Sequence, residues 1–249
     1  MTQQPTDIGD LLGSDDAEMI AKGLHPDPFG VLGPHQTGAG RVLRVFDPGA
    51  DRLEVLQKGK KPKALTPYPG TNGLFVGPLA DGDYRLRGAG WGTEWEFEDP
   101  YRFGPVIGEM DEYLLGEGTH KRLWSALGAH VMEHEGVQGT HFAVWAPSAK
   151  RVSVVGDFNG WNGRRHPMRA RGTTGVWEIF LPGVGEGTLY KYEIISGDGR
   201  LLPLKADPVG FGAQHAPETS SVVRDLRGYG WRDKKWMEAR EKAHRTDAP

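Results

Sequence analysis

The sequence predicts an all-β protein made of two tandem immunoglobulin-like β-sandwiches, with short helices at the N-terminus and in the connector. Three observations support this prediction. Among 249 residues there are 37 Gly and 18 Pro but no long apolar helical segment, a composition typical of turn-rich β proteins. Short apolar or alternating runs, separated by turn residues, recur along the chain. The two halves also repeat the same order of runs, which indicates a duplicated domain.

The N-terminal part should contain one short helix. Residues before Ser14 are polar, and we expect them to be loose. Ser14 is a suitable N-cap, Ala17 and Ile20 recur at helical spacing, and Gly23 is a suitable stop. The prolines at positions 26 and 28 lack the backbone donor that a longer helix would need, so the helix should end before them.

Residues 1–105 are predicted to form the first sandwich. Its strands are expected at residues 41–46, 52–56, 73–76, 83–87 and 93–97. In the last of these runs, Trp95 and Phe97 should point to one face of the sheet and the intervening Glu residues to the other. This alternation is typical of a strand in a sandwich.

Residues 106–135 are predicted to form a packed connector. Thr119 is a suitable cap for a short helix over residues 120–127, which Gly128 would end. The connector should be packed because it contains large apolar side chains that need burial, namely Tyr113, Leu114, Leu115 and Trp124. We interpret the acidic cluster at residues 109–112 as a solvated face.

Residues 136–228 are predicted to form the second sandwich, and residues 229–249 a charged tail. Two strands lie within residues 140–162, and further runs occupy residues 176–181, 188–195, 201–205 and 220–223. Phe142 and Val144 share one face of the first strand, and Val152 and Val154 share one face of the second. The tail has too few apolar side chains to be buried alone.

The repeat relates the two sandwiches run by run. Residues 45–50 correspond to 144–149, residues 52–55 to 151–154, and residues 73–76 to 175–178. Near the end of each copy, Tyr84 corresponds to Tyr190, and the Asp-Pro pair at residues 99–100 corresponds to the pair at 207–208. Only the second copy carries the Gly-Asp-Phe-Asn-Gly-Trp turn at residues 156–161. The copies therefore share a fold, and the second alone carries the candidate site.

This turn places a tryptophan where a sugar could reach it. The Asn159-Gly160 pair suits the positive φ angles of a tight turn, and Trp161 follows it directly. An aromatic ring can cover the apolar face of a saccharide while neighbouring polar groups bind its hydroxyls. Lys191 alternates with two tyrosines, so it should leave the opposite sheet face and could donate to hydroxyls. The alternative is a structural Trp at the sandwich edge and a solvated Lys.

Other functions are disfavoured by composition and motif. The balance of 30 basic and 33 acidic side chains argues against a nucleic-acid partner held by phosphate contacts. Residues 183–187 are glycine-rich, but a strand is expected after them, whereas a phosphate-binding loop is followed by a helix. His130 and His134 lack the context of a metal site. We therefore expect no catalytic residue, metal ion or cofactor in this chain.

The sequence also predicts the compartment. It contains no cysteine, which suits a reducing cytoplasm. The N-terminus has no apolar signal region, and no run approaches the length of a membrane span. We expect a cytoplasmic protein without a membrane partner.

Six segments together resemble a known family. They are residues 27–35, 142–147, 156–161, 163–168, 189–194 and 202–208. With these, the chain resembles the N-terminal part of bacterial glycogen branching enzymes, the 1,4-α-glucan branching enzymes, from about residue 10 to residue 249. The resemblance implies a leading sandwich, a starch- and glycogen-binding module and then a catalytic (β/α)₈ barrel. The barrel would begin where this sequence stops, so we expect the chain to be inactive alone.

The resemblance also implies site residues and partners. In related modules a Trp matching Trp161 and a Lys matching Lys191 contact glucan, and we add Asn159 and Asn162 of the same turn as carbohydrate-binding residues. The implied partners are an α-glucan, either glycogen or maltooligosaccharides, and the missing barrel in cis or trans. A second platform Trp of some modules would fall near residues 200–201, where this chain has none.

Two alternatives stay open. The chain could be a non-binding structural or docking module that orients the barrel and modulates the length of the transferred chain. A Trp161 ring buried in the sandwich would favour that role. The same module could also come from a debranching or trehalose-releasing relative, which the specific match at residues 27–35 and the duplicated leading domain disfavour.

Overall fold

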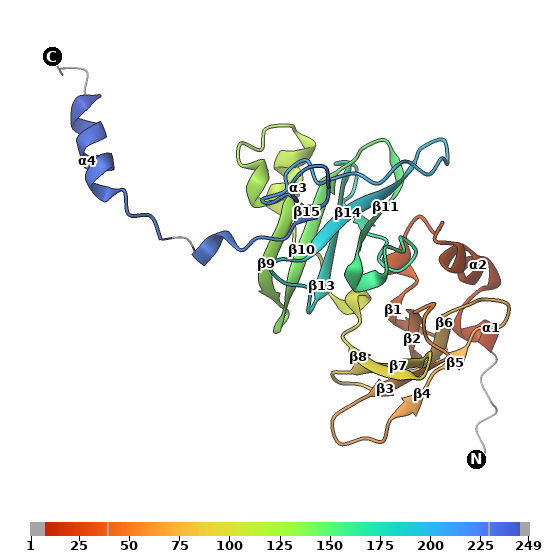
Figure 1. The fold of residues 1–249 in the computed structure, drawn as a ribbon. Helices are drawn as coiled ribbons and strands as arrows, with labels where there is room; N and C mark the ends of the chain where they lie inside the picture. Colours follow the sequence, from red (N-terminus) through yellow and green to blue (C-terminus); the bar gives the residue numbers. More distant parts are fainter. Residues whose placement is uncertain (1–7, 39, 229, 245–249) are drawn as a thin grey trace.

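The computed structural model describes residues 8–38, 40–228 and 230–244, which form two β-sandwiches in tandem (Figure 1). The all-β prediction is confirmed. The helices are short: α1 Ile8–Leu11, α2 Ser14–Lys22, α3 Glu109–Gly116 and α4 Lys234–Ala243. Single 3₁₀ turns are η1 Pro28–Gly30, η2 Pro100–Arg102, η3 Leu123–Ser125, η4 Asp157–Asn159 and η5 Leu226–Gly228.

The first sandwich packs two four-stranded antiparallel sheets, with strand orders β1-β2-β6-β5 and β4-β3-β7-β8. Their bounds are β1 Gly33–Thr37, β2 Gly40–Phe46, β3 Arg52–Leu56, β4 Lys63–Ala64, β5 Thr66–Pro67, β6 Leu74–Pro78, β7 Arg85–Gly90 and β8 Thr93–Phe97. All five predicted strands are present. Side chains of both sheets, such as Leu43, Leu53 and Leu86, are fully buried between them, because alternate residues of each strand face inward.

The N-terminal stretch differs from the prediction. Residues 8–11 form α1 instead of a loose segment, and Leu11 and Leu12 are buried. Their carbonyl oxygens accept hydrogen bonds from the Arg44 side chain at 2.8 Å and the Tyr68 hydroxyl at 3.1 Å. These partners lie more than thirty residues away, so the polar local pattern gives no sign of them. Strand β1 was missed as well, since its Gly-Pro-His-Gln-Thr sequence lacks apolar alternation.

The second sandwich packs a four-stranded sheet, ordered β12-β13-β10-β9, against a three-stranded one, ordered β11-β14-β15. Their bounds are β9 Gly128–His134, β10 Val137–Trp145, β11 Ala149–Gly156, β12 Arg169–Ala170, β13 Val176–Pro182, β14 Leu189–Ser196 and β15 Ser221–Val222. Phe142, Val152 and Tyr190 are among the fully buried side chains of its core. The run expected at 201–205 makes only two isolated bridges, from Leu201 and Lys205.

A buried Tyr–Asp pair shows how closely the two copies correspond. The Tyr84 hydroxyl donates to Asp99 Oδ2, and the Tyr190 hydroxyl donates to Asp207 Oδ2, both at 2.7 Å. Both carboxylates are buried, and burial raises the pKa of Asp99 to about 6 and also raises that of Asp207. The repeat therefore extends from strand order to a matching hydrogen bond, from a tyrosine just before β7 or near the start of β14 to the aspartate of a later Asp-Pro pair.

The predicted connector helix is wrong in position. Residues 109–116 form α3, and residues 120–127 contain only the 3₁₀ turn η3. The three acidic residues of the 109–112 cluster lie in the first turn of α3, where they complement the partial positive charge of the helix N-terminus. Gly128, expected to end a helix, has a φ of 104° and begins β9. Strand β9 pairs with β10, so the sheet of the second sandwich begins within the predicted connector.

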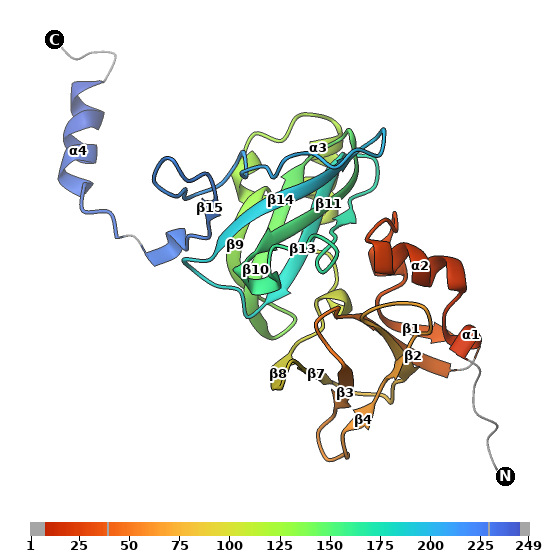
Figure 2. The same ribbon diagram turned by 45° about the vertical axis from the view of Figure 1, so that its right-hand side comes forward.

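The connector also leaves large side chains exposed. Tyr113 is 62% and Trp124 53% exposed, contrary to the expected burial. At the other end of the chain, α4 lies apart from both sandwiches in two views (Figures 1 and 2), and its Trp236 is 59% exposed. None of the helices in the described residues is long and apolar enough to span a membrane.

Candidate glucan-binding turn

The candidate turn begins where β11 ends. Gly156 is the last residue of the strand, η4 follows, and Gly160 adopts a left-handed φ of 62°. A side chain at position 156 would be impossible, since a Cβ there would lie 2.3 Å from the Leu189 carbonyl oxygen of β14. The glycines predicted to make this turn are therefore required by its geometry.

Trp161 is held in an unusual backbone conformation. Its φ of 57° is rare for a bulky residue. Its backbone N–H donates to the Gly156 carbonyl oxygen at 3.0 Å, and its indole Nε1–H donates to Asp157 Oδ1 at 2.8 Å. The side chain is partly buried and belongs neither to the buried core cluster of the second sandwich nor to the described side chains packed against it. The turn thus fixes the orientation of an accessible indole ring.

Asn159 lies beneath the turn rather than on its surface, unlike the contact residue that we predicted. It is 2% exposed. Its Oδ1 accepts from the Gly156 N–H at 3.0 Å, and its Nδ2 contacts the Val154 carbonyl oxygen and His166 Nδ1, each at 2.9 Å. The amide is therefore engaged inside the protein, and Asn159 shapes the turn.

Asn162 stays at the surface of the turn. Its Oδ1 accepts from the backbone N–H of Arg164 at 3.1 Å and from the Arg164 Nε at 3.3 Å. The Nδ2 group has no hydrogen-bond partner among the described residues and remains a possible donor. The next residue, Gly163, lies so close to Glu193 that a Cβ would meet its Oε1 at 1.9 Å. The segment that follows Trp161 therefore crosses the outer face of β14.

Lys191 lies on that same outer face. Its neighbours Tyr190 and Tyr192 are fully buried in the core, so Lys191 points outward, as the alternation predicts. It pairs across the strands with Val155, one residue before Gly156. Its Nζ donates to Thr219 Oγ1 at 2.7 Å. The structure thus brings Trp161, Asn162 and Lys191 to one end of the β11–β14 pair.

The first sandwich holds the loop that carries Trp161, a feature that no local sequence pattern indicates. Arg164 donates to the Ala21 carbonyl oxygen at 3.3 Å, and Arg151 donates to that of Gly23. Both acceptors lie at the carboxyl end of α2, where a helix has unpaired carbonyl groups and attracts cations. Arg151 and Gly23 are 128 positions apart in the sequence, and Arg164 and Ala21 are 143 apart, so only the tertiary fold brings each pair into contact.

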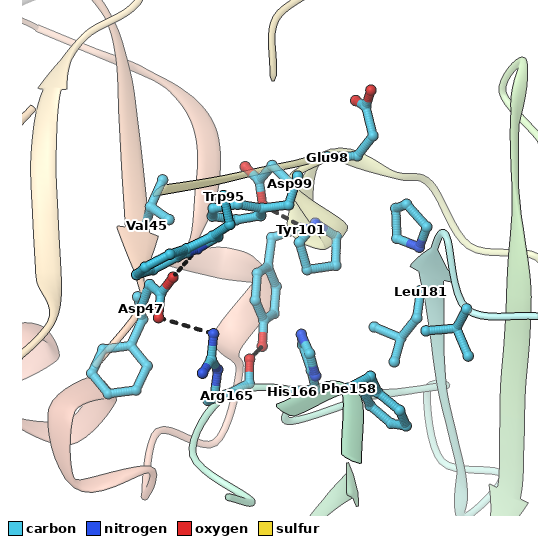
Figure 3. A pocket seen from close by; sticks show the side chains of 15 residues that line it. Val45, Asp47, Trp95, Glu98, Asp99, Tyr101, Phe158, Arg165, His166 and Leu181 are labelled. Carbon is cyan, nitrogen blue, oxygen red and sulfur yellow. Dashed lines mark hydrogen bonds and ion pairs between the residues drawn. The ribbon is translucent and has the colours of Figure 1, made fainter. Parts of the chain in front are cut away.

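A second set of contacts continues along the same loop (Figure 3). Arg165 forms an ion pair with the buried Asp47, with 2.9 Å between Nη2 and Oδ1. The Tyr101 hydroxyl is 3.3 Å from the carbonyl oxygens of Arg165 and Pro167. Next to them, burial and the charge of Arg165 lower the pKa of His166 to about 3, so its imidazole is neutral.

No group of His, Asp or Glu side chains in the described part of the chain is arranged to hold a metal ion. Leu201, which lies where some related modules have a second platform Trp, is 63% exposed. The turn offers one aromatic ring with polar groups beside it, an arrangement suited to binding.

Comparison with known proteins identifies both domains. Residues 13–101 match the N-terminal domain of the alpha-1,4-glucan branching enzyme GlgB. Residues 126–210 match carbohydrate-binding module 48, the isoamylase N-terminal domain. The second match begins close to β9 and covers Trp161, Asn162 and Lys191.

Relatives match both domains together. The 1,4-alpha-glucan branching enzyme GlgB of Roseobacter denitrificans is 58% identical over 239 residues, which are 94% of this chain and 33% of that enzyme. The enzyme of the same name from Rubrobacter xylanophilus is 55% identical, over 92% of this chain and 32% of its own length. The chain thus spans about a third of the length of these relatives.

Among solved structures, a pullulanase mutant from Paenibacillus barengoltzii complexed with maltotriose matches 53% of this chain and 19% of its own. Its TM-score of 0.35 and identity of 22% are too low to support a functional comparison. The sequence matches carry the assignment: the chain corresponds to the N-terminal domain of 1,4-alpha-glucan branching enzymes followed by carbohydrate-binding module 48, together about a third of the length of these enzymes.

Proposed function

We propose that this chain is the glucan-binding, barrel-supporting part of an enzyme of glycogen biosynthesis. The whole enzyme would cleave an α-1,4 linkage and rejoin the released chain through an α-1,6 linkage. The observation that carries the binding role is the Trp161 ring, which its own turn orients outside the sandwich core. The two matched domains support the assignment to a branching enzyme.

Binding would divide between one aromatic ring and two donors. The Trp161 ring would cover the apolar face of a glucosyl unit, while the Lys191 ammonium and the Asn162 amide would donate to its hydroxyls. Asn159 would keep the turn in shape from below. Because only one aromatic platform is present, we expect a weak complex with a Kd near 1 mM, about −4 kcal/mol.

Four exposed apolar side chains of the connector support the barrel-supporting role. We call them together the connector face: Met110, Tyr113, Leu123 and Trp124, which are 70%, 62%, 45% and 53% exposed. Large apolar side chains left exposed in a short stretch of chain often mark docking sites. The remaining two thirds of the relatives' length would supply the barrel that covers it. The catalytic carboxylates would lie there, and the cytoplasm would be the compartment.

A titration with maltoheptaose tests the binding role. The wild-type chain should bind weakly, and Trp161→Ala should lower the affinity at least several-fold because it removes the stacking surface. The matched control is Trp91→Ala, which removes an 82% exposed tryptophan from the first sandwich and should leave the affinity unchanged. Equal binding by the wild type and Trp161→Ala would remove the turn from the site.

The rival role, a docking module that binds no glucan, makes a different prediction. If the chain were such a module, neither the wild type nor any variant would bind maltoheptaose. The exposed connector face would still be available for docking. The partial exposure of Trp161 favours the binding role, as does the Asn162 amide nitrogen, which has no hydrogen-bond partner among the described residues.

A further inference from the structure

A cavity of about 190 Å³ lies between the two sandwiches (Figure 3). We call it the seam cavity. The first sandwich contributes Trp95, Phe97 and the segment from Glu98 to Tyr101, and the second contributes Phe158, His166 and the end of β13 with Val184. A ligand in this space would contact both domains at once. It would not reach the outer face of β14, where Lys191 lies, because Lys191 is not part of the lining.

One wall of the seam cavity is an aromatic platform. Trp95 of β8 lies opposite Gly88 of β7, and a Cβ on Gly88 would come within 2.5 Å of the indole ring. The absent side chain therefore lets the ring lie against the strand. The Trp95 Nε1–H donates to Asp47 Oδ2 at 3.1 Å, which fixes the rotation of the ring. Phe97 and Phe158 add further aromatic surface to the lining.

Polar groups stand beside this platform. His166 Nδ1 accepts from the Asn159 amide, so the neutral imidazole carries its proton on Nε2. Nε2 has no hydrogen-bond partner in the described part of the chain, and Figure 3 shows the imidazole directed toward the cavity beside Tyr101. Asp47 Oδ2 accepts only one hydrogen bond among the described residues, from Trp95, and keeps acceptor capacity.

The lining offers an anion little attraction. It contains three carboxylates, those of Asp47, Glu98 and Asp99, and one guanidinium, that of Arg165. Glu98 is paired with Arg85 and Arg102, which lie outside the lining. Arg165 is already paired with Asp47, and His166 is neutral. A phosphate group would therefore find no unpaired cation among the described lining residues, whereas a ring with uncharged hydroxyls would meet an aromatic face, a donor and an acceptor.

We propose that the seam cavity is a second sugar-binding site, which takes one neutral glucosyl unit between the sandwiches. The choice of a glucosyl unit rests on the proposed function; the preference for a neutral, hydroxylated ring rests on the lining itself. The size of the cavity suits one ring and excludes a helical glucan segment. An occupied site would join the two domains through a common ligand and act independently of the Trp161 turn.

Nuclear magnetic resonance of the ¹⁵N-labelled tryptophan side chains tests this proposal on the whole chain. The Nε1–H signals of Trp95 and Trp161, assigned with Trp95→Phe and Trp161→Ala, would be followed during titration with maltose and, separately, with glucose 1-phosphate. Val184→Phe fills the cavity from the second sandwich. Val137→Phe, a matched change on β10 outside the lining, is its control, and thermal unfolding of each variant checks its fold.

We expect maltose to shift the Trp95 signal in the wild type and in Trp161→Ala, and glucose 1-phosphate to leave it in place. Val184→Phe should abolish the Trp95 shift and keep the Trp161 shift, unlike Val137→Phe. A Trp95 signal that stays fixed while that of Trp161 moves overturns the seam site alone. A Trp95 shift without a Trp161 shift upholds the seam site and refutes the turn. A stronger response to glucose 1-phosphate refutes the preference for a neutral ring.

Discussion

Asn159 and Asn162 lie three positions apart in one turn and have opposite roles. Asn159 is buried and engaged in three contacts, whereas the Asn162 amide nitrogen has no partner within the described residues. The residue type was informative in both cases, since Asn favours turns. The alternation of side chains in a strand does not extend into a turn, so the sequence could not say which Asn faces inward.

This difference predicts opposite effects of the two alanine substitutions. Asn159→Ala leaves the buried Gly156 N–H and Val154 carbonyl without their partner, at a cost of about 1–3 kcal/mol for each unsatisfied group. Asn162→Ala should change the free energy of unfolding little and weaken maltoheptaose binding. Urea unfolding and the sugar titration, made on both variants, separate the effects. A stable Asn159→Ala would contradict its buried role.

His166 makes the stability of the chain depend on pH. Its pKa is lowered from 6.5 to about 3 in the folded chain, first by burial and then by Arg165. Below about pH 6.5 His166 is protonated in the unfolded chain but stays neutral in the folded chain. The free energy of unfolding therefore decreases as the pH falls from 6.5 toward 3. Asp99, with a raised pKa of about 6, has the opposite slope, because its stabilising effect is lost as the pH rises through that value.

The variant His166→Gln separates the contribution of His166 to the pH dependence of stability from that of Asp99. The free energy of unfolding, measured with urea at about pH 5 and about pH 7, should fall toward the lower pH by more in the wild type than in the variant. The Asp99 contribution is common to both proteins and cancels in the comparison. The same change with pH in both proteins would show that His166 is protonated in the folded chain.

At the scale of elements, helix α2 has a role beyond covering the first sandwich. Its carboxyl end accepts hydrogen bonds from Arg151 and Arg164 of the second sandwich. Arg164 also donates to Asn162. The helix is therefore joined through one side chain to the turn that carries Trp161, and we expect it to hold this turn in place.

Arg164→Met tests that link. Methionine keeps most of the apolar stem but cannot bond Ala21 or Asn162, so the Trp161 turn should become more mobile and bind maltoheptaose several-fold more weakly. Hydrogen exchange at residues 157–164 should rise, with little change elsewhere. Arg200→Met is the control, because Arg200 is an exposed arginine that pairs locally with Asp198. Unchanged exchange in Arg164→Met would show that the turn needs no support from α2.

Elements with strong local patterns were predicted well, and those that depend on distant partners were not. Strands such as β8 and β13 alternate or are strongly apolar, so their positions followed from the sequence. Helix α1 and strand β9 lack such a pattern. Leu11 in α1 is held by Arg44, and β9 pairs with β10. Within the connector, the acidic residues stabilise α3 at a site where we expected only solvent.

At the scale of the whole molecule, the connector face should make the chain associate with itself. Its four apolar side chains are exposed, and their burial between copies of the chain is favourable. Sedimentation should therefore show concentration-dependent association. Replacing Tyr113 and Trp124 by Ser should reduce it without loss of sugar binding. Trp91→Ser, which removes an exposed tryptophan elsewhere, should leave it unchanged; a monomeric wild type would contradict this expectation.

The sequence by itself determined the two sandwiches, their duplication and the turn that singles out the second copy. These features are local, because alternation, glycine turns and repeated Tyr and Asp positions are properties of neighbouring residues. Only the tertiary structure decided which residues of that turn face outward and what holds it. Arg164 reaches α2, Arg165 reaches Asp47, and a cavity opens between the domains. Contacts over more than a hundred residues depend on how the two sandwiches pack, and no local pattern encodes that packing.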